Sequence, residues 1–341
     1  MLTHKQKYEH RSVLITGGLG FIGSNLAHRL TEIGDVEVII VDSLDADQGG
    51  NPFNVHQIKD KLKIHIADMN DSSIINHLVA GVDYIFNLAG SSSHIDSMQN
   101  PHRDLQSNCQ AQLTLLEACR TFNPQAKIIF TSTRQVYGSP VYLPLDENHR
   151  ILPLDINGAN KIAAEHYHLL YQRIYGLRTT CLRLTNTYGK RQQIQNDRHG
   201  FISWFIRKAL DNETIELFGD GKQRRDLNYV EDVIDALLLA GASEDANGEI
   251  YNIGHHQPIS LFDLATEIIR IAGSGSIIGV PFPYERRLID IGNCYSSYEK
   301  IQNKLGWQPK TELRTGLTET IEFYKENRDE YWGCKKTSAV S

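Results

Sequence analysis

The chain has 341 residues, a hydrophobic content of 40% and a formal net charge of −6 at pH 7. This is the composition of a soluble globular protein, long enough for two domains or for one large α/β unit with a smaller lobe. The mild acidity, with no basic run longer than residues 222–225, argues against nucleic acid as the main partner. No apolar stretch approaches the roughly 20 residues of a membrane helix, so we expect no membrane partner.

The N-terminal residues and the spacing of the cysteines indicate the cellular compartment of the protein. Residues 1–11 are polar and basic and lack the apolar core of a signal peptide, so we expect a cytoplasmic protein. The cysteines are scattered, without a C-x-x-C pair, which favours buried thiols over a zinc site or a disulfide framework. We therefore expect no metal. The five cysteines are Cys109, Cys119, Cys181, Cys294 and Cys334.

Short β-branched runs alternate with helical patterns through the first half of the chain. Buried strands are predicted at residues 12–16, 36–41, 62–66, 84–88, 127–131 and 179–184. Helices are predicted at residues 22–33, 72–80, 102–121 and 159–175. Strands separated by helices imply right-handed crossovers, so we predict an α/β fold with a Rossmann-type, doubly wound parallel sheet.

From about residue 188 the chain mixes helices, such as one at residues 201–210, with short strands and loops. This pattern predicts a smaller C-terminal substrate-binding lobe. A helix at residues 230–242 is expected to return to the first domain. We therefore predict a nucleotide-binding domain over residues 1–187, with 228–255 interleaved, and a lobe mainly over 188–341.

Residues 13–23, VLITGGLGFIG, read as a strand, a glycine turn and the start of a helix. Gly17 permits the tight turn, Gly20 lets the backbone approach a pyrophosphate, and Gly23 lets the helix lie close to the sheet. The phosphates then lie over the helix N-terminus at Phe21 and Ile22, where free N–H groups and the helix dipole favour negative charge. The segment predicts a dinucleotide site.

Acidic and small residues at the next strand ends complete this site. Asp42 lies about 20 residues after the turn, where a carboxylate accepts hydrogen bonds from the adenosine ribose and repels a 2′-phosphate, so NAD is favoured over NADP. Asp68 follows the third strand and either meets the adenine edge or caps a helix. Leu88 and Ala89 end the fourth strand, where small residues let the backbone lie against the cofactor.

These residues together resemble the extended short-chain dehydrogenase/reductase family, which includes nucleotide-sugar epimerases and dehydratases. The resemblance runs from Val13 to about Tyr324. It implies NAD as the cofactor and a nucleotide diphosphate sugar as the substrate. The matching segments are residues 16–23, 132–138, 183–189, 219–226, 229–233, 251–254 and 305–309.

The resemblance also assigns catalytic positions. The family's hydroxyl residue, which polarises the substrate oxygen, maps to Thr133. Its Tyr-x-x-x-Lys pair maps to residues 157–161, where Lys161 is in place to hold the nicotinamide ribose but Asn157 stands where the tyrosine should be. Asn108 matches an asparagine that helps order the family's proton relay.

An asparagine amide cannot exchange a proton as a phenol does, although it can orient a sugar hydroxyl or a water. Three interpretations stay open. In the first, hydride chemistry persists, and Lys161, a water or another side chain moves the proton. His94 is the first candidate for that side chain, and the alternative is that His94 is an exposed loop histidine. Alternatively, the reaction needs less help from a base, or the chain is a non-catalytic nucleotide-sugar binder. Tyr137 is no substitute, because the family carries its equivalent as well.

The residues after Thr133 narrow the reaction. Family 4,6-dehydratases carry Asp-Glu there and decarboxylating relatives carry Glu at the second position, whereas this chain has Arg134 and Gln135. An NAD-dependent epimerase is therefore the leading hypothesis. A dehydratase or ketoreductase with atypical acid–base groups is the alternative. Arg134 either binds an anionic or hydroxyl group of the sugar or is a surface charge.

The resemblance places the nucleotide as well. Asn186 and Arg225 map to the diphosphate, with Asp226 as a possible brace for Arg225. Arg287 and Asp290 map near the phosphate and the nucleotide ribose, with a structural ion pair as the alternative.

Two further features have open readings. The basic segment 190–199 either adds phosphate contacts or is a solvated charge run. The apolar faces of the helices at 102–121 and 159–175 match the helices that pair in family dimers, which implies a homodimer, with core packing within one chain as the alternative.

Overall fold

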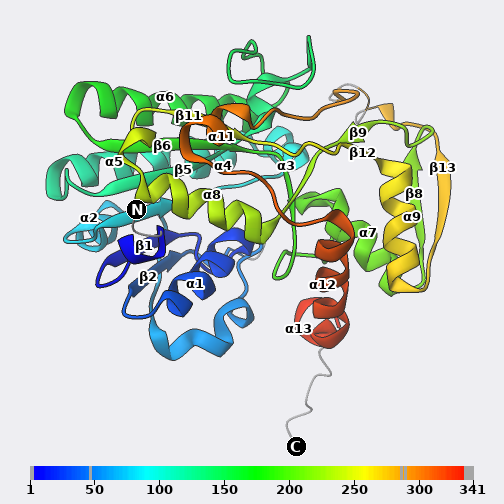
Figure 1. The fold of residues 1–341 in the computed structure, drawn as a ribbon, viewed down its shortest axis with the longest axis horizontal. Helices are drawn as coiled ribbons and strands as arrows, with labels where there is room; N and C mark the ends of the chain where they lie inside the picture. The colour runs from blue at the N-terminus through cyan, green and yellow to red at the C-terminus, as the bar shows by residue number, and fades with distance from the viewer. Residues whose placement is uncertain (1–3, 46–47, 285–286, 288–289, 334–341) are drawn as a thin grey trace, which may run out of the picture.

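The computed structural model describes residues 4–45, 48–284, 287 and 290–333 (Figure 1). Its centre is a seven-stranded sheet with the order β11-β6-β5-β4-β1-β2-β3, in which every neighbouring pair is parallel. The predicted Rossmann-type α/β fold is confirmed. The strands are β1 (Ser12–Thr16), β2 (Glu37–Asp42), β3 (Leu62–Ile66), β4 (Tyr84–Asn87), β5 (Lys127–Thr133), β6 (Arg178–Leu184) and β11 (Ile250–Ile253).

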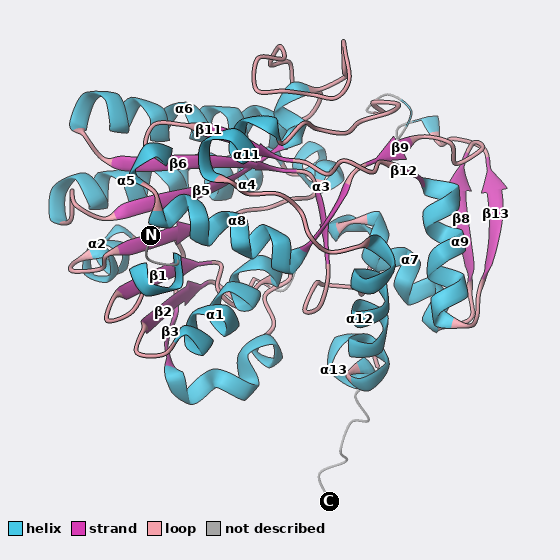
Figure 2. Cartoon of the chain, in the orientation of Figure 1, coloured by secondary structure: helices cyan, strands magenta, loops and turns pink. Residues whose placement is uncertain are grey.

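Alternate residues of the strands send their side chains to opposite faces of this sheet. Val13 and Ile15 of β1 join one core, whereas Leu14 joins the other. Helices cover both faces (Figure 2). The first core contains α1 (Phe21–Ile33) and α8 (Val230–Ala242), and the second contains α2 (Ser72–Val79) and α5 (Ala111–Phe122).

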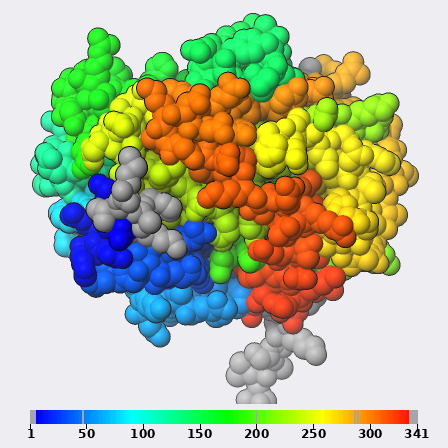
Figure 3. Space-filling view, viewed as in Figure 1, coloured from blue at the N-terminus to red at the C-terminus, as the bar shows by residue number. Residues whose placement is uncertain are grey.

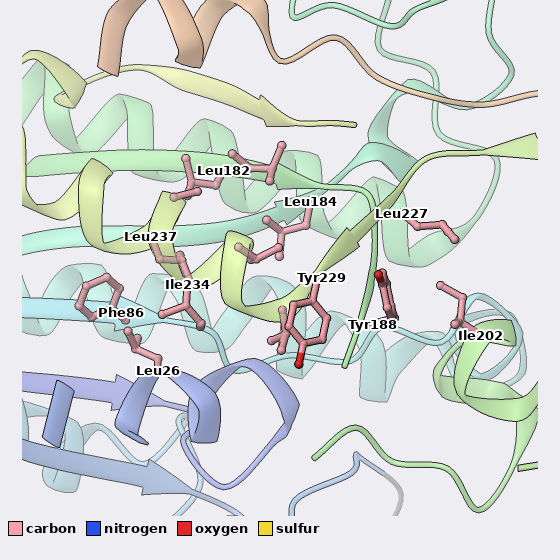
Figure 4. Packing of buried hydrophobic residues seen from close by; sticks show 14 of the residues in the cluster. Leu26, Phe86, Leu182, Leu184, Tyr188, Ile202, Leu227, Tyr229, Ile234 and Leu237 are labelled. Carbon is pink, nitrogen blue, oxygen red and sulfur yellow. The ribbon is translucent and has the colours of Figure 1, made fainter. Parts of the chain in front are cut away.

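Helix α8 returns to the sheet, as its apolar pattern predicts. Its Leu237 packs in one buried cluster with Leu26 of α1, Phe86 of β4 and Leu182 of β6 (Figure 4). The following strand, β11, then pairs with β6 from Ile250 to Ile253 and becomes the edge of the sheet. This seventh strand is not among the strands predicted from the sequence.

The helix predicted at residues 102–121 is interrupted. It consists of α4 (Pro101–Leu105), a π-helical turn at Gln106–Gln110, and α5. A π turn inserts one residue into the helical repeat, so side chains before and after it point in directions that a single α-helix would not allow. This interruption positions Asp104 and Asn108 toward α6 (Ile156–Tyr175), where both are buried.

The C-terminal lobe contains α7 (Phe201–Leu210), α9 (Leu261–Ala272), α12 (Leu313–Glu326) and α13 (Arg328–Tyr331), beside the parallel pair β8 (Thr214–Phe218) and β13 (Ser276–Val280). Its junction with the sheet holds β7 (Asn186–Tyr188), β9 (Arg224–Arg225), β10 (Leu227–Tyr229) and β12 (Ile259–Ser260).

Helix α11 (Glu299–Leu305) leaves this lobe and returns to the first domain, where Lys300 Nζ donates to Ile250 O at 2.8 Å. The space-filling view shows this orange segment at the surface, against yellow-green residues from the middle of the chain (Figure 3). None of the described helices has both the length and the apolar character needed to cross a membrane.

Candidate active site

A cleft of about 660 Å³ lies at the carboxyl ends of the sheet strands, between the sheet and the C-terminal lobe. Parallel α/β sheets bind their ligands at this edge. The cleft is lined by almost all of the site residues predicted from the sequence. These are Gly17, Gly20, Phe21, Ile22, Gly23, Asp42, Asp68, Leu88, Ala89, Thr133, Arg134, Asn157, Lys161, Asn186, Arg225 and Asp290.

The glycine turn forms a cradle that larger residues would fill. Gly17 has a φ of +68°, and a Cβ added at Gly23 would lie 2.3 Å from Gly17 O. A Cβ at Gly17 would lie 3.0 Å from the Cα of Ala89 on the neighbouring strand end. The backbone therefore approaches itself closely at the N-terminus of α1, which is the shape that a dinucleotide pyrophosphate requires.

Asp42 braces this turn and faces the cleft. Its Oδ2 accepts from Leu19 N at 3.0 Å, and its Oδ1 accepts from Leu44 N at 2.9 Å. Burial raises the pKa of this carboxyl, and the two backbone hydrogen bonds oppose the rise. Each carboxylate oxygen has a second lone pair, so hydrogen bonds to a ribose remain available.

Asp68 is exposed at the edge of the cleft, where it accepts from Asn70 N at 2.8 Å. Its reading as a helix cap is wrong, because Asp71 caps α2 through Ser73 N and Ile74 N. A contact from Asp68 to adenine stays a prediction.

Thr16 and Asn87 hold the fourth strand end and are absent from the residues predicted from sequence. Thr16 Oγ1 donates to Asn87 Oδ1 at 3.0 Å and accepts from the backbone N–H groups of Leu88 and Ala89, both at 3.0 Å. Both polar side chains are fully buried. They fix the Leu88–Ala89 backbone beside the glycine turn.

Thr133 and Lys161 lie where the resemblance implies, at the end of β5 and on α6. Thr133 Oγ1 accepts from Gln135 N at 3.2 Å, which leaves its hydroxyl hydrogen able to donate into the cleft. Lys161 Nζ donates to Thr131 O at 3.3 Å and lies 5.0 Å from the centre of the Phe130 ring. Burial lowers the pKa of Lys161 to about 8, although the charges of Asp104 and Glu165 oppose the shift.

Asn157 lies one helical turn before Lys161 and is buried. Its amide nitrogen donates to Ser91 O at 2.8 Å and to Asp104 Oδ2 at 3.0 Å. Asp104 Oδ1 accepts from Asn160 Nδ2 at 2.8 Å. Both amide hydrogens of Asn157 are thus committed to the protein, and its carbonyl oxygen is the group that can bind a ligand.

Asn108 lies in the π turn with neither polar atom of its buried amide hydrogen-bonded within the described part of the chain. It points at Gly90, where an added Cβ would lie 2.4 Å from Asn108 Oδ1 and 3.0 Å from Lys161 Nζ. A buried amide without a partner normally binds a water or a ligand. The glycine cradle, Gly90 and Lys161 line one cleft that fits a dinucleotide reaching from α1 to Lys161, and the unpaired Asn108 amide lies directly behind Gly90.

His94 and Gln135 occupy the same wall of the cleft as Thr133. His94 Nδ1 is hydrogen-bonded to Asp155 Oδ2, and its Nε2 lies 2.6 Å from Gln135 Nε2. His94 is therefore the hydrogen-bonded first residue of α3 (His94–Gln99) and not a loop residue, although its side chain is partly exposed. Asp155, the N-cap of α6, is not among the residues predicted from the sequence, and its position before a helix is the signal that could have indicated it.

Tyr137 faces away from this chemistry, as expected for a residue that does not replace the missing phenol. Its hydroxyl donates to Asn252 Oδ1 at 2.6 Å and accepts from Arg183 Nη1 at 2.8 Å. It is fully buried.

The other end of the cleft is cationic. Arg134 Nη2 lies 3.5 Å from Asn186 Oδ1. Arg225 Nη1 donates to Arg224 O at 3.0 Å, and its Nη2 lies 3.8 Å from Asp290 Oδ1. Burial and, next, the charge of Arg134 lower the pKa of Arg225 to about 10. Two guanidinium groups that repel each other in one cleft favour an anionic ligand.

No hydrogen bond or ion pair joins Asp226 to Arg225 among the described residues, although the charge of Asp226 opposes the fall in the pKa of Arg225. Asp226 Oδ2 accepts instead from the backbone N–H groups of Ser296 at 3.1 Å and His255 at 3.3 Å. Burial raises the pKa of Asp226 to about 6. This carboxylate ties β9 and β10 to the segment that precedes α11.

Arg287 is exposed and does not line the cleft, so its nucleotide contact stays a prediction. The basic segment 190–199 is largely paired within the chain. Lys190 Nζ lies 3.0 Å from Glu319 Oε2, and Arg198, which lines the cleft, lies 3.3 Å from Asp96 Oδ1. Within the described residues, no cluster of His, Cys, Asp or Glu side chains could hold a metal ion.

Comparison with known proteins places this geometry in a family. Residues 13–254 match the model of the NAD dependent epimerase/dehydratase family. A putative UDP-glucose 4-epimerase of Methanocaldococcus jannaschii is 35% identical over 92% of this chain and 99% of its own length. The UDP-glucose 4-epimerase of Mycolicibacterium smegmatis is 31% identical over 92% of this chain and 98% of its own.

Comparison with solved structures supports the same family. A UDP-glucose 4-epimerase of Thermotoga maritima, determined with UDP-glucose, has a TM-score of 0.85 and 32% identity over 93% of this chain and 99% of its own. Pal of Bacillus thuringiensis has a TM-score of 0.85 and 32% identity over 92% and 99% of the two chains. This chain is therefore an enzyme of the NAD-dependent epimerase/dehydratase family, and its cofactor is NAD.

Proposed function

We propose that this enzyme is an NAD-dependent epimerase of nucleotide diphosphate sugars. One observation carries the proposal: a single cleft joins the glycine cradle, the Thr133–Lys161 pair and the cationic end formed by Arg134 and Arg225. The cradle and Lys161 suit NAD, and the arginines suit a diphosphate. The sugar then lies between them, beside Thr133.

The chain's own groups would bind and orient the substrate. NAD, when bound, supplies a hydride acceptor and donor. Thr133 donates a hydrogen bond to the reacting oxygen, Lys161 binds the nicotinamide ribose, and the Asn157 carbonyl accepts from a sugar hydroxyl. Arg225 and Asn186 bind the diphosphate.

Epimerisation is favoured over dehydration because Arg134 and Gln135 cannot supply the acid and base that eliminate water. Uridine diphosphate sugars are the first substrates to test, since related proteins from M. jannaschii, M. smegmatis and T. maritima are described as UDP-glucose 4-epimerases. A solved relative from Methanobrevibacter ruminantium, with a TM-score of 0.86 and 29% identity, is described as a UDP-N-acetylglucosamine 4-epimerase.

A homodimer is part of the proposal. Helices α5 and α6 expose large apolar side chains, which burial between two copies would cover. A cytoplasmic location is also proposed, since free thiols are usual in a reducing compartment. The exposed apolar residues are Phe122, Leu170, Ile174 and Tyr175, and the free thiols are Cys109, Cys119, Cys181 and Cys294.

Incubation with a panel of nucleotide sugars in deuterated water tests the function. An epimer without solvent deuterium at the inverted carbon is expected, because the hydride returns from the cofactor. A 4-keto-6-deoxy product would identify a dehydratase, and binding without turnover would identify a non-catalytic binder. Either result would overturn the proposal. Light scattering of the wild type and of Ile174→Glu tests the dimer.

A further inference from the structure

His94 and Asp155 form an imidazole–carboxylate pair in the wall of the cleft. His94 begins α3 (His94–Gln99), and Asp155 caps α6. The Asp155 side chain is 6% exposed, whereas that of His94 is 38% exposed. The carboxylate is therefore withdrawn from solvent, and the imidazole stands between it and the open cleft.

These contacts determine which nitrogen carries the proton. A carboxylate accepts, so the Nδ1 atom bound to Asp155 is protonated, and Nε2 of the neutral ring keeps a free lone pair. Gln135 Nε2, at 2.6 Å, donates to that lone pair. The neutral imidazole is therefore oriented as a proton acceptor.

Gln135 can also serve the protonated ring. Its Oε1 is buried and has no hydrogen-bond partner among the described residues. A half-turn of the amide would bring Oε1 to His94 Nε2, where it would accept from the imidazolium. The Gln135 amide can therefore hydrogen-bond to His94 Nε2 in either protonation state of the ring, as a proton-exchanging group requires.

Hydrogen bonds join this pair to the residues at the reacting carbon. The backbone N–H of Gln135 donates to Thr133 Oγ1 at 3.2 Å. Asp155 Oδ1 accepts from Gly158 N at 2.7 Å, in the helical turn that carries Asn157. Asn157 itself has committed both amide hydrogens to Ser91 and Asp104 and carries no exchangeable acid proton.

We infer that His94, oriented by Asp155, exchanges the proton of the sugar hydroxyl at the reacting carbon, in place of a tyrosine. The inference rests on the proposed function. The hydroxyl would displace the Gln135 amide from His94 Nε2, and its proton would move to that nitrogen as the carbon–oxygen double bond forms. The C–H bond would break with its electron pair, and bound NAD would accept that hydride and return it to the opposite face of the sugar. His94 would then give its proton back to the oxygen.

The first test removes the proton acceptor and keeps the fold. In His94→Asn, the amide nitrogen still donates to Asp155, but Nε2 is lost. We expect kcat to fall about 100- to 10,000-fold, the usual contribution of general acid–base catalysis, with KM and NAD affinity changed less than about threefold. His77→Asn, at an exposed position of α2, is the matched control and keeps full activity. Added imidazole is expected to restore part of the activity of His94→Ala.

The second test follows the imidazole without turnover. In Asp155→Asn, the amide oxygen still caps Gly158 N, but the negative charge beside His94 is lost. We expect ¹⁵N NMR of the NAD-loaded, sugar-free protein to show that the Nε2-protonated tautomer of His94 gains population over the Nδ1-protonated tautomer of the wild type. The kcat is expected to fall as well, because an Nε2 atom that carries the proton cannot accept one.

The outcomes separate the two proposals. If the wild type converts no nucleotide sugar, the proposed function fails, and this role of His94 fails with it. If the wild type is active and His94→Asn keeps its kcat, only the role of His94 is overturned. The same holds if His94→Asn loses NAD binding, which indicates a structural role, or if Asp155→Asn leaves the tautomer of the His94 imidazole unchanged.

Discussion

The side-chain amide of Asn157 donates to Asp104 Oδ2 at 3.0 Å and so joins α6 to α4 beneath the cleft. Asp104 is 3% exposed, and Asn160 donates to its other oxygen. A buried carboxylate is stable when charge-assisted hydrogen bonds satisfy both oxygens. Asn157 is therefore part of a structural clamp as well as a wall of the active site.

Asn157→Ala separates these two roles. We expect the free energy of unfolding to fall by about 1–3 kcal/mol, since one oxygen of Asp104 loses its donor. Asn160→Ala removes the other donor from a residue that does not line the cleft, so we expect a similar loss of stability with KM unchanged. Urea unfolding measures the stability of each variant, and steady-state kinetics measure its KM. An identical KM in all three proteins would contradict a substrate contact from Asn157.

Lys161→Met is expected to stabilise the ligand-free protein and to weaken NAD binding. Burial lowers the pKa of Lys161 from 10.5 to about 8, and each unit corresponds to about 1.4 kcal/mol, so the buried charge costs up to about 3 kcal/mol at pH 7. The unfolded wild type binds more protons than the folded one between pH 8 and 10.5, so wild-type stability rises across this window. The advantage of the variant should therefore shrink by pH 10.5. Urea unfolding at pH 7 and pH 10.5 measures the difference in stability, and calorimetry measures the affinity for NAD.

Asp226→Asn should also stabilise the protein at pH 7. Burial raises the pKa of Asp226 from 3.8 to about 6, so the folded state binds more protons than the unfolded state between these values. Stability therefore falls as the pH rises through this window, and the variant should gain up to about 3 kcal/mol at pH 7 and nothing below pH 4. The asparagine oxygen can still accept from Ser296 N and His255 N. Thermal unfolding at pH 4 and pH 7 would refute this prediction if the two differences were equal.

Arg225→Lys tests the cationic end of the cleft. A lysine keeps the charge but loses the planar fork that binds phosphate oxygens in pairs, so we expect UDP to bind about tenfold more weakly. Arg224→Lys is the matched control, because the Arg224 side chain donates to Pro258 O. Calorimetry at low salt should show normal affinity for the control. Equal losses in both variants would indicate a general charge effect in place of a phosphate contact.

The position of the glycine turn and Asp42 in one cleft could be predicted because it depends on local spacing. Gly17, Gly20 and Gly23 lie within seven residues, and Asp42 ends the next strand, so residue type and distance along the chain suffice. The parallel sheet could be predicted for the same reason, from strands that alternate with helices.

The part of the cleft around His94 and Asn157 could not be predicted in full, because it depends on pairs that are distant in sequence. His94 meets Asp155 across 61 positions, and Asn157 meets Asp104 across 53. A π turn also changes which side chains of the α4–α5 helix face inward, and periodicity does not reveal one inserted residue. The pairing of β11 with β6 likewise follows from tertiary structure.

The pairing of β11 with β6 has a consequence for the synthesis of the protein on the ribosome. The register joins Cys181 to Ile250, so β6 emerges from the ribosome well before its partner strand. At translation rates of about 5–20 residues per second, the interval is on the order of 3–14 seconds. During that time strand β6, which is buried in the folded protein, presents an unpaired edge to other nascent chains, a known route to aggregation. Slow codons for residues 185–249, or a low temperature while this segment is synthesised, lengthen the interval and should therefore reduce the yield of soluble protein. Chaperones that shield nascent strands should restore it.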